Sequence, residues 1–134
     1  MSALPRQTPA DPMPSPEAID TALRAFFRAA ELWNLSNDEC RTILGHPGRA
    51  TYFQWKRGTV KTIPYDTVRR VSWILGIYKA LQILFADSER ADAWLRKPNA
   101  RFGGHSALDR MLAGDVTDLA YVRRALDAAR GGGA

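Results

Sequence analysis

The sequence predicts an all-α protein, with an N-terminal helix-turn-helix half followed by a C-terminal helical half. Apolar residues recur every three or four positions along most of the chain, and no stretch shows the two-residue alternation of a β-strand. Breaks rich in glycine and proline separate these stretches, and serine or aspartate caps open several of them. With 134 residues and 46% hydrophobic content, the chain is long enough to bury a core.

The first predicted helix runs from Pro16 to about Leu32. Ser15 caps it, Pro16 occupies its first position, and Glu17 faces the positive end of the helix dipole. The preceding residues 1–15 are rich in proline and lack hydrophobic periodicity, so they are predicted to be a disordered tail. The buried stripe of the helix is predicted to comprise Ile19, Leu23, Phe26, Phe27, Ala30 and Trp33.

Two short helices joined by a tight turn are predicted to form the helix-turn-helix. Ser36 and Glu39 make a capping box that opens the first helix. The run 45–48 contains two glycines and a proline and ends it, and the second helix spans 49–57 before Gly58. The residues predicted to face the core are Cys40, Ile43, Leu44, Tyr52 and Trp55.

The outward side of the second of these helices carries residue types that suit DNA. Arg49 can clamp guanine, Gln54 can pair with adenine, and Thr51 can touch a thymine methyl group. The alternative is a solvated basic face, and the net charge of +5 suits nucleic acid and acidic proteins equally. With operator DNA as the predicted partner, the predicted DNA-binding residues are Arg49, Thr51, Gln54, Lys56, Arg57 and Lys61.

The helix predicted to start at Pro64 is apolar on nearly all sides as far as Phe85. Such a helix is buried on several sides, so we expect one face to pack in its own core and residues 68–86 to join two copies of the chain. A two-fold dimer would present two reader helices to two half-sites. The alternative is a central helix that a large core requires. Gly76 is a candidate for a bend or a split in this helix.

The stretch 94–115 predicts a rigid scaffold. Pro98 ends a helix, Gly103 and Gly104 permit backbone angles that side chains forbid, and Ser106 opens a short helix through a capping box. The apolar stripe of that short helix is predicted to comprise Leu108, Met111 and Leu112. Asp109 is predicted to complete its capping box and Gly114 to be its C-cap. The helix before it is predicted over 89–95, capped by Asp87 and Ser88.

The last predicted helix begins at Asp115, with Asp118 as its third residue. Leu119, Val122 and Leu126 form its inward stripe. Arginine and tyrosine dominate binding hot spots, although a solvated basic face is the alternative here too. The residues predicted to be exposed for a partner are Tyr121, Arg123, Arg124 and Arg130, with Asp127 as the one nearby acid, and residues 131–134 are predicted to be flexible.

The sequence offers no arrangement typical of a catalytic, metal or cofactor site. His46 and His105 each sit beside glycine without a neighbouring cysteine or carboxylate pair, and a single cysteine, Cys40, excludes an internal disulfide. We therefore expect neither an enzyme nor a metal or cofactor. Without a signal-peptide pattern or an apolar run long enough to cross a bilayer, the chain is expected to be cytoplasmic and to have no membrane partner.

The C-terminal half resembles the toxin-binding domain of the Xre/MbcA/ParS antitoxin family. The shared order is W-L-x-x-P-N-x-x-[LF]-G-G, then L-D-x-[LM]-L-A-x-G after a few residues. The resemblance continues upstream into the helix-turn-helix and covers about residues 20–131. The residues that match in spacing are Trp94, Leu95, Pro98, Asn99, Gly103, Gly104, Leu108, Asp109, Leu112 and Gly114.

The resemblance implies a type II antitoxin that blocks the active site of a RES-domain toxin, an enzyme that degrades NAD, and that binds its own promoter. It implies a DNA-binding domain over 16–75 and a toxin-binding domain over 76–134. A stand-alone repressor without a toxin partner is the alternative. Combined with the exposed set above, the predicted toxin-binding residues are Trp94, Pro98, Asn99, Gly103, Gly104, Tyr121, Arg123, Arg124 and Arg130.

Overall fold

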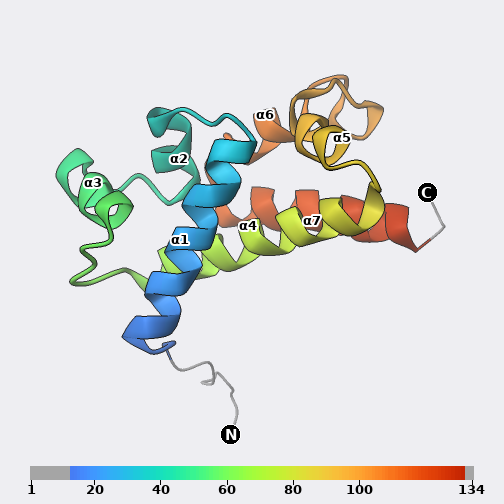
Figure 1. Ribbon diagram of the computed structural model, residues 1–134. Coiled ribbons are helices and arrows are strands. Elements are labelled where there is room, and N and C mark those ends of the chain that lie inside the picture. The colour runs from blue at the N-terminus through green and yellow to red at the C-terminus, as the bar shows by residue number, and fades with distance from the viewer. Residues whose placement is uncertain (1–12, 132–134) are drawn as a thin grey trace, which may run out of the picture.

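The computed structural model describes residues 13–131, and within this range every regular element is a helix (Figure 1), which confirms the all-α prediction. Most of the tail predicted over 1–15 and most of the flexible end predicted over 131–134 lie outside the described residues. The α-helices are α1 (Pro16–Leu32), α2 (Asn37–Ile43), α3 (Arg49–Arg57), α4 (Tyr65–Leu84), α5 (Ser88–Ala93), α6 (Ala107–Met111) and α7 (Val116–Arg130), with 3-10 turns η2 (Trp94–Arg96) and η3 (Ala100–Phe102) between α5 and α6.

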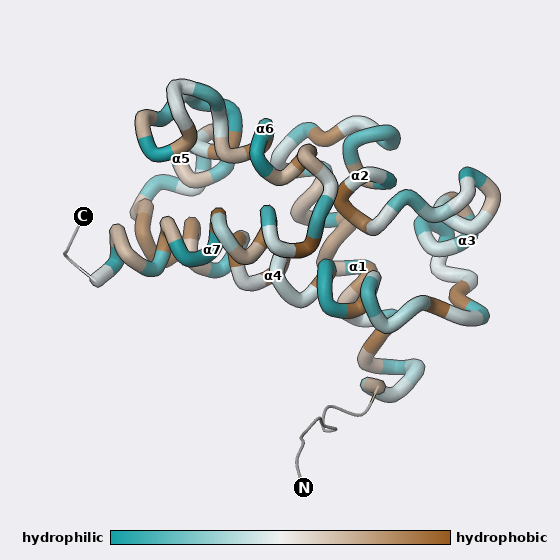
Figure 2. The backbone as a smooth tube through the Cα atoms, turned by 180° about the vertical axis from the view of Figure 1, so that it is seen from behind, coloured by the Kyte–Doolittle hydropathy of each residue, from teal (hydrophilic) through white to brown (hydrophobic). Residues whose placement is uncertain are grey.

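The long helix α4 is the centre of the fold. In Figure 1 α1 crosses it near its start, and α7 lies beside it and runs in the same direction. Val71, Ile74, Ile77 and Leu81 of α4 are buried between these neighbours. Figure 2 shows teal and brown alternating along α7, as expected for a helix with one buried side and one exposed side.

The split considered at Gly76 is wrong, because α4 continues through that position as one helix. Gly76 instead leaves room for the side chain of Arg123 from α7. A Cβ atom at Gly76 would overlap the guanidinium of Arg123. The glycine therefore serves packing between two helices and does not interrupt its own helix.

The predicted caps Ser15, Ser36, Asp87, Ser106 and Asp115 are confirmed. At α2 and α6, Ser36 and Ser106 each accept a hydrogen bond from the third helical N–H, and the acid at that position accepts one in return. Asp115 caps α7 in the same way. The N–H of Ser106 donates to Asp109 and lowers the pKa of that carboxyl, while the Thr117 hydroxyl and N–H lower the pKa of Asp115.

A buried arginine of α4, Arg70, joins the two halves of the chain. Its side chain is only 10% exposed. Its Nη1 donates to the carbonyl oxygens of Ile43 at 3.4 Å and of Gly114 at 3.0 Å, and its Nε lies 2.6 Å from Oδ2 of Asp66. One side chain thus satisfies the end of α2, in the N-terminal half, and the turn before α7, in the C-terminal half.

A second arginine, Arg96 in η2, makes a similar connection. Its Nη2 donates to the carbonyl oxygen of Asn34 at 2.7 Å, and its Nε to that of Trp33 at 3.4 Å. The same guanidinium lies 3.5 Å from Oε1 of Glu39 in α2. The carbonyl groups that end α1 are therefore satisfied by a residue more than sixty positions later in the chain.

Two predicted helix ends differ from the structure. The α-helix predicted over 89–95 ends at Ala93 and continues as the 3-10 turn η2, after which Lys97 is extended ahead of Pro98. α6 ends at Met111 with Leu112 as its C-cap, so Gly114 is not the cap; it adopts a left-handed φ of 99° two residues later. The inward positions predicted for Cys40, Tyr52 and Trp55 are confirmed.

Candidate functional site

The exposed side of α3 carries the residues predicted to read DNA. Arg49 and Thr51 are exposed, and Gln54 is partly exposed. The guanidinium of Arg49 lies 5.6 Å from the ring centre of Phe53 and 3.8 Å from Oδ1 of Asp38. The N-cap of α3 is a glycine without a side-chain bond, and its first turn contains no acid, so its free N–H groups and Arg49 present positive potential together.

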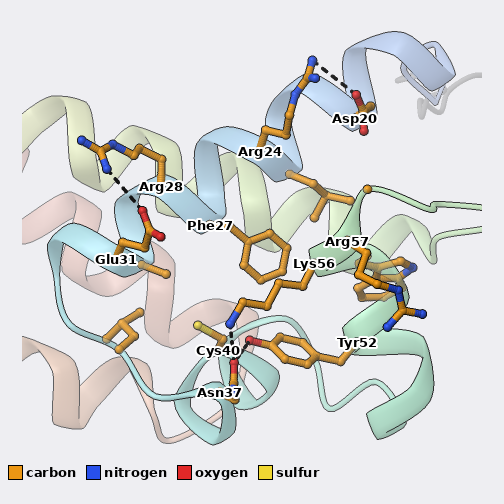
Figure 3. A pocket seen from close by; sticks show the side chains of 15 residues that line it. Asp20, Arg24, Phe27, Arg28, Glu31, Asn37, Cys40, Tyr52, Lys56 and Arg57 are labelled. Carbon is orange, nitrogen blue, oxygen red and sulfur yellow. Dashed lines mark hydrogen bonds and ion pairs between the residues drawn. The ribbon is translucent and has the colours of Figure 1, made fainter.

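Lys56, predicted to contact phosphate, also has a structural role. Its Nζ donates to Oδ1 of Asn37 at 2.8 Å, and the Tyr52 hydroxyl donates to the same oxygen at 2.8 Å (Figure 3). The ammonium group therefore ties α3 to the first turn of α2, while Arg57 and Lys61 remain exposed. Burial raises the pKa of Tyr52 and of the neighbouring Cys40 thiol, so both stay protonated at neutral pH.

The residues that follow Pro98 build a closed loop. Oδ1 of Asn99 accepts from the N–H of Arg101 at 2.9 Å, and the backbone of Asn99 bonds to that of His105 at 2.9 Å and of Gly104 at 3.0 Å. Gly103 and Gly104 take left-handed φ values of 66° and 86°. Within this loop the asparagine and the glycines therefore determine the backbone shape, and both glycines are exposed at the surface.

Aromatic contacts hold this loop against α7. Phe102 packs edge-on to Trp94 at 6.1 Å and to Tyr121 at 5.9 Å between ring centres. The guanidinium of Arg110 lies 3.9 Å from the ring centre of Tyr121 and 2.7 Å from Oδ1 of Asp118. The loop and the start of α7 thus form one surface, on which Tyr121 stays 40% exposed. Periodicity gave no signal for the role of Arg110.

One member of the set predicted to be exposed on α7 is placed differently. The Arg123 side chain is 30% exposed, its Nε binds Oδ1 of Asp127 at 3.1 Å, and its guanidinium lies over Gly76 of α4. Arg123, predicted to be exposed, is therefore only partly exposed, because α4 lies against that side of α7. Arg124 and Arg130 are exposed.

Replacing Gly76 with alanine is expected to change the free energy of unfolding by less than about 1 kcal/mol, because the helix-propensity gain offsets displacement of Arg123. In an Arg123→Ala background the same Gly76→Ala change should stabilise by about 1 kcal/mol, since nothing opposes the new Cβ. Urea unfolding of the wild type, the two single variants and the double variant measures this double-mutant cycle. Equal effects in both backgrounds would show that Arg123 does not pack on Gly76.

The described part of the chain shows neither a cluster of three or more histidine, cysteine, aspartate or glutamate side chains placed for a metal ion, nor a helix long and apolar enough to cross a membrane. The surfaces that stand out are instead the basic face of α3 and the loop surface against α7.

Comparison with known proteins assigns both surfaces to one family. Residues 21–76 match the antitoxin Xre-like helix-turn-helix domain, and residues 80–132 match the antitoxin Xre/MbcA/ParS C-terminal toxin-binding domain. The chain belongs to the Xre/MbcA/ParS antitoxin family. This confirms the predicted family, and it makes the chain an antitoxin of a toxin–antitoxin system.

A relative of this antitoxin occurs in Sinorhizobium fredii (strain NBRC 101917 / NGR234), where it carries the name uncharacterized protein y4oB. The two sequences are 54% identical over 114 residues, which cover 85% of this chain and 88% of the relative. The similarity therefore includes both halves of the antitoxin. The helix-turn-helix match ends at residue 76 and the toxin-binding match begins at residue 80, both inside α4.

Proposed function

We propose that this antitoxin neutralises a RES-domain toxin in the cytoplasm by covering the active site with which the toxin degrades NAD, and that it represses its own operon by binding operator DNA. The observation that carries the proposal is the single surface made by the Pro98–His105 loop and α7, within the toxin-binding domain of the family. Covering an active site is steric, so it requires no chemistry from the antitoxin itself.

The partner-binding residues divide into two roles in this proposal. Trp94, Pro98, Asn99, Gly103 and Gly104 shape the loop that lies against the toxin. The residues of α7 supply contacts through exposed side chains, and a rigid aromatic ring beside mobile arginines is a common composition of hot spots. These contact residues are Tyr121, Arg124 and Arg130, while Arg123 positions α7 on α4.

Co-purification with the toxin tests the proposal. The tagged antitoxin is isolated from its native host, the bound protein is identified by mass, and NAD consumption is assayed before and after the antitoxin is stripped off under denaturing conditions and the partner refolded. A stoichiometric partner that consumes NAD only when freed is the expected result. A partner that is inactive on NAD would contradict the RES assignment, and an antitoxin that isolates alone would favour the stand-alone repressor.

Base reading by α3 is expected to depend on Arg49 and Gln54. Replacing either with alanine should lower discrimination between operator and unrelated DNA by about 1–3 kcal/mol, because each removes a bidentate base contact. Competition binding against a mixed-sequence duplex measures the difference. Arg90→Ala in α5, also an exposed arginine, is the control and should leave discrimination unchanged. Equal loss in the control would mean that α3 does not read bases.

We also propose that the antitoxin forms a homodimer, through part of the segment 68–86. α1 and α7 cover much of α4, but an apolar hollow of about 330 Å³ remains between α1 and α4. Ile19, Ala22, Ile63, Val68 and Leu75 line it. A second copy placed here would give the two-fold pair of α3 helices that half-sites require, and sedimentation equilibrium tests the mass.

A further inference from the structure

A groove of about 670 Å³ lies between α1 and α3 (Figure 3). Two arginines of α1, Arg24 and Arg28, and two basic residues of α3, Lys56 and Arg57, line it. The acids among its lining residues are Asp20 and Glu31, so the groove carries a net charge of +2. Charge complementarity therefore favours an anionic occupant.

The α1 arginines are free to exchange their partners. Their side chains are 71% and 70% exposed. Nη2 of Arg24 lies 3.3 Å from Oδ2 of Asp20, and Nη1 of Arg28 lies 3.2 Å from Oε1 of Glu31, both on the same helix. Exposed pairs of this kind contribute little stability, so a phosphate oxygen can replace either carboxylate at low cost.

The apolar residues of the groove argue against a protein occupant. Protein-binding hot spots usually place an exposed aromatic side chain beside the arginines, as Tyr121 does on α7. The large hydrophobic side chains that are exposed in residues 13–131 lie elsewhere, at Met13, Leu32, Tyr65, Ile83 and Tyr121. The floor of the groove, including Leu23, Tyr52 and Trp55, is already buried in the antitoxin's own core.

We propose that Arg24 and Arg28 of α1, together with Arg57 of α3, bind backbone phosphates of the DNA duplex that α3 reads. The inference rests on the proposed DNA-binding function and extends the DNA surface to α1. α3 itself borders the groove. In a duplex bound to α3, the phosphates next to the bases that α3 reads would therefore lie at the edge of the groove. Asp20 and Glu31 hold the arginines in the free protein and compete with the phosphates.

The test measures binding of a mixed-sequence duplex, and of a duplex from upstream of the antitoxin gene, at several salt concentrations. Arg24→Gln with Arg28→Gln should reduce the slope of log affinity against log salt by about 2 per bound protomer, which corresponds to roughly 30-fold weaker binding at about 0.15 M salt. The control, Arg90→Gln with Lys97→Gln, removes the same charge from exposed positions in the C-terminal half and should keep the wild-type slope.

A second double variant should change DNA affinity in the opposite direction. Asp20→Asn with Glu31→Gln removes the competing acids and should strengthen DNA binding several-fold at fixed salt. This variant tests the proposed phosphate contacts even if the arginine variants fold poorly. A wild-type salt slope in the arginine variant would overturn the inference. So would an equal reduction of the slope in the arginine variant and in the control. So would unchanged DNA binding with weakened toxin binding, since the groove would then serve the protein partner. If the wild-type antitoxin binds neither duplex, the proposed DNA function itself fails.

Discussion

Replacing Arg70 with methionine is expected to lower the free energy of unfolding by about 3 kcal/mol, or to lower Tm by on the order of 10 °C. Methionine keeps much of the apolar stem but leaves the carbonyl groups of Ile43 and Gly114 without the donor that joins them. Buried acceptors that lose their partners cost more than the average net value of a hydrogen bond. Thermal and urea unfolding followed by circular dichroism measure the loss.

The neighbouring residue supplies a matched control. Arg69 is also in α4 but is exposed, so Arg69→Met makes the same chemical change in the same helix and should alter Tm by only a degree or two. Comparable losses in the two variants would mean that the bonds of Arg70 to Ile43 and Gly114 do not stabilise the junction of the two halves.

Reversing the charge of Arg124 and Arg130 together is expected to abolish neutralisation of the toxin. Each arginine projects from the exposed part of α7, and glutamate would replace attraction by repulsion at an acidic or substrate-binding surface. If the two act as hot spots, the dissociation constant for the toxin should rise at least about 100-fold. Titration of toxin activity with the antitoxin variant, measured as loss of NAD, reads this out directly. Arg123 is left intact because it packs against α4.

The complementary variant is Arg57→Glu with Lys61→Glu in the N-terminal half. It carries the same change in charge, and it should retain toxin neutralisation while losing DNA affinity. The Arg124 and Arg130 variant should show the reverse pattern. Full neutralisation by the α7 variant would refute the assignment of this helix to the toxin interface.

Local chemistry made much of this fold predictable from sequence. A serine followed three residues later by an acid marks the starts of α2 and α6, and apolar spacing gives the buried faces of α1 and α7, because both signals act within one or two helical turns. The end of α5 is less predictable, because Pro98 restricts only Lys97 before it and does not show that the preceding turn takes 3-10 geometry.

Contacts between distant segments were not predictable in the same way. Arg70 bonds to Gly114, 44 residues away, and no local pattern encodes that pairing. One signal was present: Arg70 falls on the line of Thr67, Ile74 and Ile77, all of which are buried, so a charge at that phase of α4 required a partner. The partial burial of Arg123 is not predictable from local sequence, because it depends on the position of Gly76 in α4, 47 residues earlier in the chain.

The continuity of α4 restricts how this antitoxin can be rearranged. α1 and α7 both pack against this helix, and Arg70 bonds to the carbonyl groups of Ile43 and Gly114. One continuous helix therefore joins the helix-turn-helix half to the toxin-binding half. A recombination event that exchanged one half for that of another antitoxin would divide α4, which packs against both α1 and α7. On the proposed toxin interface, new toxin specificities should therefore arise by substitution on α7 and its loop, with α4 inherited whole.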